Sequence, residues 1–129
     1  MIDLSRLPEG STLNPPAAPE AIAAADVALP ARMPAELAEL LAQADGVVAN
    51  HFVIYDCTSL PERNATYEVG AYAPGFVTFG DNSGGFALML RGGAGPSPVF
   101  LVDHGAMTED VMEEIAPSLS AWVAQGCPL

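Results

Sequence analysis

The amino-acid sequence predicts a single α+β domain, in which helices gather on one face of a mainly antiparallel sheet. Three observations lead to this prediction: a helical apolar pattern at residues 34–45, a series of short apolar segments with glycine-rich turns at residues 76–103, and a second helical pattern that begins at residue 108. The chain has 129 residues, which is enough for one hydrophobic core but not for two. We expect an extended arm at residues 1–18 and one folded domain at residues 19–129.

The N-terminal half begins with the arm, which is rich in Pro, Ser, Asn and Gly, and continues with an alanine-rich segment that has the character of a short helix. Residues 34–45 form the clearest helical pattern, because their apolar positions are three or four residues apart and Asp45-Gly46 favours a helix end. Glu36 and Glu39 are then expected on the solvent-facing side. Two β-prone stretches and one helical turn follow, at residues 47–49, 52–56 and 58–62.

The most informative segment is a predicted β-hairpin. Phe76–Phe79 and Phe86–Leu90 are apolar and β-prone, and residues 80–85, GDNSGG, favour a turn because they tolerate positive φ or bond their own backbone. This turn resembles the GDSGG loop that carries the catalytic serine of chymotrypsin-like proteases. The inserted Asn82 changes the spacing, however, and the chain is too short for the two-barrel domain of that class. We therefore interpret the segment as a structural hairpin tip and expect no catalytic residue in it.

The C-terminal third is predicted to contain one more strand and one long helix. A turn at residues 92–96 precedes the strand at residues 98–103, and Thr108 is a good N-cap for the helix. Four apolar residues share one stripe of this helix: Val111, Ile115, Leu119 and Trp122. Four acidic residues occupy its opposite, solvent-facing side: Glu109, Asp110, Glu113 and Glu114. Pro117 removes one backbone hydrogen bond, so we expect a kink or a short break in the helix there.

Charge is the second informative property of the chain. Sixteen Asp and Glu residues face four Arg and no Lys, so the formal net charge is −12. The acids are spread over both halves, which indicates an acidic domain rather than an acidic tail. Nucleic-acid binding is disfavoured because no basic stripe can be assembled, and the absence of Lys excludes Walker A and Schiff-base chemistry. The acidity either keeps an apolar chain in solution or steers association with a basic partner.

The sequence indicates no cofactor, no metal centre and no membrane span. Cys57 and Cys127 are 70 residues apart without metal-binding spacing, and we expect them to remain thiols in a reducing compartment. His51 and His104 also lack partners at the spacing of metal ligands. No apolar run reaches 18 residues, and the first residues lack the features of a signal peptide. We therefore expect a cytoplasmic protein without a cofactor.

The order of these features resembles the SUKH superfamily, and specifically its SMI/KNR-type branch. The resemblance covers about residues 28–125 and is most specific in FVTFGDNSGGFALML, where a strand ending in glycine leads through a glycine-rich tip to a second apolar strand. The other matching features are the helix ending in Asp45-Gly46, the strand FVIYD, a Ser59-Leu60 segment, Tyr67-Glu68-Val69, the strand ending in Val102-Asp103, and a C-terminal helix with a late tryptophan. The arm, the alanine-rich segment and Pro117 are not features of the family.

The resemblance implies a SUKH-like fold and a role as an immunity protein. Bacterial members of this family are largely immunity proteins of polymorphic toxin systems, which bind and neutralise toxin domains, many of them nucleases. We therefore expect a non-enzymatic protein whose partner is a cognate toxin domain with a basic surface. Two alternatives stay open: an intracellular regulatory or scaffold module of the same fold, and a small hydrolase or ligand-binding enzyme, which has less support.

The candidate partner-binding residues are acidic or amide side chains on the expected surface. They are Glu68, Asp81, Asn82, Asp103, Glu109, Asp110, Glu113 and Glu114. Asp81 and Asn82 have an alternative role, because both side chains can satisfy the backbone of the hairpin turn. The alternative for the acids near residue 110 is a solvated helix face, and Tyr67 is interpreted as a core residue. The sequence implies no particular oligomeric state.

Overall fold

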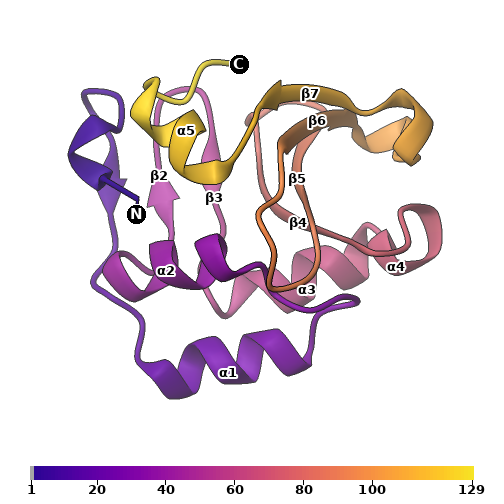
Figure 1. The fold of residues 1–129 in the computed structure, drawn as a ribbon, viewed down its shortest axis with the longest axis horizontal. Helices are drawn as coiled ribbons and strands as arrows, with labels where there is room; N and C mark the ends of the chain where they lie inside the picture. The colour runs from indigo at the N-terminus through magenta and orange to yellow at the C-terminus, as the bar shows by residue number, and fades with distance from the viewer. Residues whose placement is uncertain (1) are drawn as a thin grey trace.

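The computed structural model describes residues 2–129 and contains a seven-stranded antiparallel sheet and five α-helices (Figure 1). The strands are β1 (Thr12–Leu13), β2 (Val47–Val48), β3 (Val53–Ile54), β4 (Phe76–Asp81), β5 (Phe86–Arg91), β6 (Val99–Asp103) and β7 (Glu113–Ala116). The helices are α1 (Pro19–Val27), α2 (Ala35–Gln43), α3 (Ser59–Thr66), α4 (Val69–Tyr72) and α5 (Leu119–Ala124), with single 3₁₀ turns η1 (Leu4–Arg6), η2 (His104–Ala106) and η3 (Glu109–Val111). The predicted α+β class is confirmed.

The sheet is a continuous meander, because strands that follow one another in the chain are neighbours in the sheet, with β1 and β7 at its two edges. Its centre is the predicted hairpin, β4 and β5, extended by β6. A register shift between Thr78 and Gly80 bends β4 where it meets β3. At this point a Cβ atom on Gly80 would overlap the carbonyl oxygen of Val53, so only glycine allows the two strands to approach.

Asn64 of α3 continues the sheet where β3 ends. β3 pairs with β4 only at Gly80 and Asp81, so Thr78 has no strand neighbour on that side. Asn64 takes this place: its Oδ1 accepts from the Thr78 amide at 3.0 Å, and its Nδ2 donates to the Thr78 carbonyl at 3.0 Å. The same Nδ2 donates to the carbonyl of Leu60 at 2.9 Å. A buried amide side chain thus satisfies the backbone of a central strand.

Apolar side chains form a core on each face of the sheet. The first core joins α2 and α5 to the sheet and includes Leu37, Leu40, Leu41, Phe52, Ile54, Val77, Phe79, Leu88, Leu90, Leu119 and Trp122. The second core lies on the other face and consists of Val69, Ala73, Phe76, Ala87, Met89, Phe100, Val102 and Met107. Val69 comes from α4 and Ala73 is its C-cap, so the expectation that helices gather on one face was wrong. The residues alternate between the cores along β5 and β6, as strand geometry requires.

Helix α2 is the predicted amphipathic helix, with small differences at its ends. Pro34 is the N-cap rather than the first helical residue, and the helix ends at Gln43. Gly46 adopts positive φ, 94°, in the turn that follows. The expectation that Glu36 and Glu39 face solvent was wrong, because both are half-buried and accept backbone hydrogen bonds.

These two bonds attach distant parts of the chain to α2. Glu36 Oε1 accepts from the amide of Leu119 at 3.0 Å, and Glu39 Oε2 accepts from the amide of Ile2 at 2.6 Å. Ile2 is buried, and its carbonyl accepts from Gln43 Nε2 at 3.1 Å. Ile2 therefore packs on the domain, and β1 joins the sheet beside β2.

The predicted long helix from residue 108 was wrong. Thr108 caps only the turn η3, residues 113–116 form the strand β7, and α5 begins at Leu119 with Ser118 as its N-cap. Two causes explain the difference. A residue before proline is biased toward extended backbone, so Pro117 opposes a helix at residue 116. In addition, β6 would have an unpaired edge without β7, and residues 113–116 pair with this edge as a strand.

The expected apolar stripe is consequently divided. Leu119 and Trp122 are fully buried, and Trp122 packs edge-on against Phe52, with ring centroids 5.2 Å apart. Val111, by contrast, is 53% exposed, and Ile115 is only partly buried. Among residues 2–129, no helix combines the length and the apolar character that crossing a membrane requires.

Candidate functional site

The acidic side chains divide into those bonded within the fold and those without a partner. Six are half-buried and each accepts a hydrogen bond from a backbone amide or a tyrosine hydroxyl: Asp26, Glu36, Glu39, Asp45, Asp56 and Asp81. Four are exposed and have a local partner: Asp3, Glu62, Asp103 and Glu109. The other six are exposed and have no side-chain hydrogen bond or ion pair within residues 2–129: Glu9, Glu20, Glu68, Asp110, Glu113 and Glu114. We call these six the free acids.

Three of the free acids lie within five residues of the chain, on or next to β7. This strand is the last of the sheet, and Figure 1 shows it along the margin of the molecule. Glu113 lies opposite Leu101 and Glu114 opposite Phe100, which belong to opposite faces of the sheet. The two carboxylates therefore project on either side of the strand. We call Asp110, Glu113, Glu114 and the backbone of residues 113–116 the β7 edge.

Glu109 has a different environment from its neighbours. Its Oε2 accepts from Arg91 Nη2 at 2.8 Å, and both side chains are about half exposed. The Arg91 guanidinium also lies over the rings of Phe76 and Phe100, at 4.9 and 5.5 Å from their centroids. Glu109 therefore holds an arginine over the second core and is partly neutralised by it. Its charge is less available to a partner than the charges of the free acids.

Asp81 and Asn82 have structural functions in the hairpin. Asp81 Oδ2 accepts from the Tyr55 hydroxyl at 2.7 Å and its Oδ1 from the Ser83 amide at 2.9 Å. Burial, followed by the bond to Asp81, raises the pKa of Tyr55, so this hydroxyl remains a neutral donor at physiological pH. Asn82 Oδ1 accepts from the amides of Gly84 and Phe86 at 2.9 and 3.1 Å. These bonds close the loop between β4 and β5.

Asp103 and Glu68 lie near the same hairpin tip. Asp103 pairs with Phe86 across β6 and β5, and its Oδ1 accepts from the Gly105 amide at 2.7 Å. The next residue, His104, stacks on Tyr67 with ring centroids 4.1 Å apart, which places the α3–α4 turn beside this loop. Tyr67, interpreted from sequence as a core residue, is half-buried and packs against the second core. Glu68 precedes α4 with left-handed φ of 54°.

The eight predicted site residues therefore form two groups rather than one patch. Asp103 pairs with Phe86 at the first residue of β5, whereas Glu109 contacts Arg91 at the last. Five residues of strand separate these positions, which corresponds to roughly 16 Å. One group surrounds the hairpin tip and is mostly bonded within the fold. The other includes the β7 edge, whose carboxylates are free.

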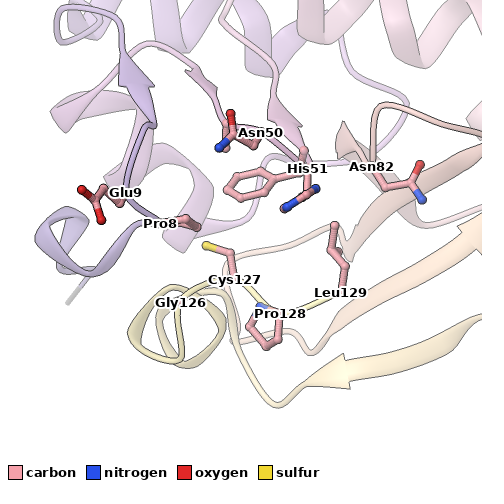
Figure 2. A pocket seen from close by; sticks show the side chains of 11 residues that line it. Pro8, Glu9, Asn50, His51, Asn82, Gly126, Cys127, Pro128 and Leu129 are labelled. Carbon is pink, nitrogen blue, oxygen red and sulfur yellow. The ribbon is translucent and has the colours of Figure 1, made fainter.

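A pocket with a volume of about 640 Å³ lies between the N-terminal arm, the β2–β3 loop, the hairpin tip and the C-terminal residues (Figure 2). Figure 2 shows the carboxylate of Glu9 and the amide of Asn82 on opposite sides of it, with the amide of Asn50 directed away from both. Cys127 also lines the pocket, and burial raises the pKa of its thiol to about 12. This thiol is therefore protonated at neutral pH and is not an activated nucleophile.

The other candidate chemical groups are also unsuited to catalysis. Ser83 lies in the hairpin loop with φ of 60°, and its hydroxyl bonds to no histidine among residues 2–129. Burial, and secondarily Asp45, raises the pKa of Cys57 to about 12. Within residues 2–129, no three His, Cys, Asp or Glu side chains are grouped so that they could hold a metal ion.

Comparison with known protein families identifies the family of this chain. The model of the SMI1 / KNR4 family (SUKH-1) matches residues 16–125, which is most of the chain. The chain belongs to this family. The resemblance inferred from sequence is confirmed, and the match begins earlier than the expected residue 28, so it includes α1. A comparison with curated proteins found no significant match.

Sequence reasoning missed the edge strand of this SMI1 / KNR4 family member. Pro117 could have indicated this strand, because the backbone before a proline is biased toward extended conformations. The division of the acids into bonded and free ones had no sequence signal. The bonds of Glu36 and Glu39 reach residues 83 and 37 positions away, and only the folded chain shows them.

Proposed function

We propose that this SMI1 / KNR4 family member is a non-enzymatic immunity protein that acts in the cytoplasm and neutralises a cognate toxin domain by binding a basic surface of that domain. The observation that carries this proposal is the set of six free acids, which the fold itself does not use. The two ion pairs within residues 2–129 involve only Arg63 and Arg91. The exposed surface therefore keeps a strong excess of negative charge.

The physics of association supports this function. A net charge of −12 produces a field that attracts a positively charged partner and raises the rate of encounter. Toxin domains that act on nucleic acid need a basic surface to bind phosphates, so they complement an acidic inhibitor. Family membership supports the same function, because the resemblance to the SUKH superfamily implies a role as an immunity protein. The polar side chains that line the pocket are Glu9, Asn50, His51 and Asn82, and among residues 2–129 no hydrogen bond joins any two of them, so they give the enzyme hypothesis no specific support.

The direct test is neutralisation. If a gene beside that of this chain encodes a toxin domain, this domain is expressed in a bacterial host, with and without this chain, and growth is measured. Absence of such a gene would favour the regulatory or scaffold alternative. We expect the chain to restore growth and to co-purify with the toxin domain as a complex. Absence of both growth and complex would refute the proposal. A stable complex without restored growth would support the alternative of a regulatory or scaffold module.

A second measurement tests the electrostatic part of the proposal. The association rate of the purified pair is measured by stopped flow as salt is raised, since the screening length falls to about 8 Å at physiological ionic strength. We expect the association rate to fall by about tenfold or more between low and high salt. A rate that is independent of salt would show that the acidity serves solubility alone.

A further inference from the structure

The β7 edge has unpaired backbone groups as well as charge. β7 pairs on one side with β6 and is the final strand of the sheet. Among residues 2–129, no backbone hydrogen bond joins residues 113–116 to any segment other than β6. An unpaired edge of this kind is a template for an additional strand. The opposite edge is shorter, because β1 contains only Thr12 and Leu13.

The side chains of the β7 edge determine which strand could bind. Glu113 and Glu114 are exposed on the two sides of the strand, and Asp110 lies just before it. Val111 and Ile115 add apolar surface next to these charges. An incoming strand that alternates between basic and apolar residues carries its cations on one face, so it can place a cation near Glu114 and an apolar side chain near Ile115, which lies on the other face with Glu113.

A second copy of this chain does not fit the edge. Two β7 edges placed together would bring glutamates near glutamates, and like charges across strands are destabilising. The net charge of −12 on each chain adds to this repulsion. Pro117 limits the strand to four residues, and the register shift beside Phe100 bends it, which also disfavours extended self-pairing. These features oppose self-association but leave the edge open to a short basic segment.

We propose that β7 docks an extended basic segment of the partner, which joins the sheet as an eighth strand. This inference rests on the proposed function for the partner's positive charge. Backbone hydrogen bonds along residues 113–116 contribute the affinity, and the glutamate on the face that carries the cations, Glu113 or Glu114, selects Lys or Arg at the facing position. The remaining contacts with the partner surround this strand, because four residues of pairing alone give weak binding.

The test uses a synthetic probe, an eight-residue peptide that alternates Lys and Val and is blocked at both ends. It is titrated into the isotope-labelled full chain, and amide chemical shifts and hydrogen exchange are followed by NMR. We expect shifts and slowed exchange concentrated at residues 113–116. Equal or larger effects at β1 or at the hairpin tip would overturn the proposal, as would the absence of any effect.

Two controls separate backbone pairing from charge. A peptide of the same sequence with an N-methyl group at every residue cannot donate along either edge, and we expect it to lose binding. Equal binding by the methylated peptide would show attraction by charge alone and would overturn the strand model. The Glu113→Lys/Glu114→Lys variant should bind the original peptide about tenfold more weakly, since attractive pairs become repulsive ones.

The matched control for this variant is Glu9→Lys/Glu20→Lys, which changes net charge equally at two free acids outside β7. We expect its affinity to stay within about twofold of the original chain. Equal weakening by both variants would overturn the assignment to β7. Circular dichroism and the fluorescence of Trp122 verify that each variant is folded.

The outcome also separates this inference from the proposed function. If the Glu113→Lys/Glu114→Lys variant still neutralises the toxin domain with unchanged affinity, the docking edge is refuted and the immunity function stands. If the original chain fails to neutralise but the peptide orders residues 113–116, the edge stands and the immunity function is refuted.

Discussion

Replacing Asn64 with alanine would test how the sheet is completed beyond β3. The change removes three buried hydrogen bonds and leaves both the amide and the carbonyl of Thr78 without a partner. A buried polar group that loses its partner costs about 1–3 kcal/mol, so two groups predict a loss of about 2–6 kcal/mol in the free energy of unfolding. Stabilities of single domains are about 5–15 kcal/mol, so this loss is large enough to measure by urea unfolding. The fluorescence of Trp122, the single tryptophan, reports the transition.

An Asn64→Asp variant adds a pH-dependent version of the same test. The new side chain can still accept from the Thr78 amide, but it brings a carboxylate close to the carbonyl oxygens of Thr78 and Leu60. Burial and these carbonyls raise the folded pKa of the new carboxyl above its unfolded value of about 3.9. Stability is therefore greatest below the unfolded pKa and is lost as pH rises through the folded pKa. We expect the variant to recover part of its stability, relative to the original chain, as pH falls from 7 toward about 4.

The control is Glu62→Ala, an exposed position of the same helix, which should change the free energy of unfolding by less than about 0.5 kcal/mol. The reasoning would be refuted if Asn64→Ala cost less than about 1 kcal/mol and left amide exchange at Thr78 unchanged. That result would mean that water satisfies this part of β4 in place of the side chain.

Three further predictions concern the scaffold of the site. Gly80→Ala should lower the free energy of unfolding in urea by about 1–3 kcal/mol, because the added methyl overlaps the carbonyl oxygen of Val53 in β3. Gly85→Ala, whose methyl enters open space, should lower it less. Equal losses would contradict the close approach of Gly80 to β3. Ser118→Ala should cost about 1 kcal/mol and Ser118→Asn much less, since the cap of α5 is lost only in the first; equal thermal midpoints would contradict this. Burial raises the pKa of Cys57 and Cys127 to about 12, above about 8.5 in the unfolded chain, so the stability present below pH 8.5 should be lost as pH rises toward 12. Replacing both cysteines with alanine should reduce this loss in urea titrations at pH 8 and 10.5, and an unchanged loss would exclude the thiols as its cause.

The central part of the fold could be predicted from sequence because local and tertiary preferences agree there. The leucines of α2 are spaced for one helix face, and the turn between β4 and β5 uses residues that favour a turn. The prediction of a helix at residues 108–116 was wrong, because the apolar spacing of this segment fits a helix while Pro117 and the unpaired edge of β6 favour a strand. Tertiary pairing decided between two locally acceptable structures.

The candidate site was harder to predict than the fold. Sequence identified Glu113 and Glu114 as acids in the densest charged region, and the structure places them on a sheet edge rather than a helix face. It could not distinguish them from Glu36 or Glu39, because the difference lies in hydrogen bonds to residues far along the chain. Bonding partners, rather than charge density, separate available carboxylates from structural ones.

The bond between Glu36 and the Leu119 amide has a consequence for biosynthesis. These residues are 83 positions apart, and α5 supplies Trp122, which packs against Phe52 in the first core. During translation, α2 and β3 leave the ribosome long before α5 exists, so their apolar faces remain exposed on the nascent chain. Exposed surface of this kind is bound by chaperones and promotes aggregation. Closure of the first core therefore waits until α5 has been synthesised, and a chain interrupted before Leu119 would become a substrate for proteolysis.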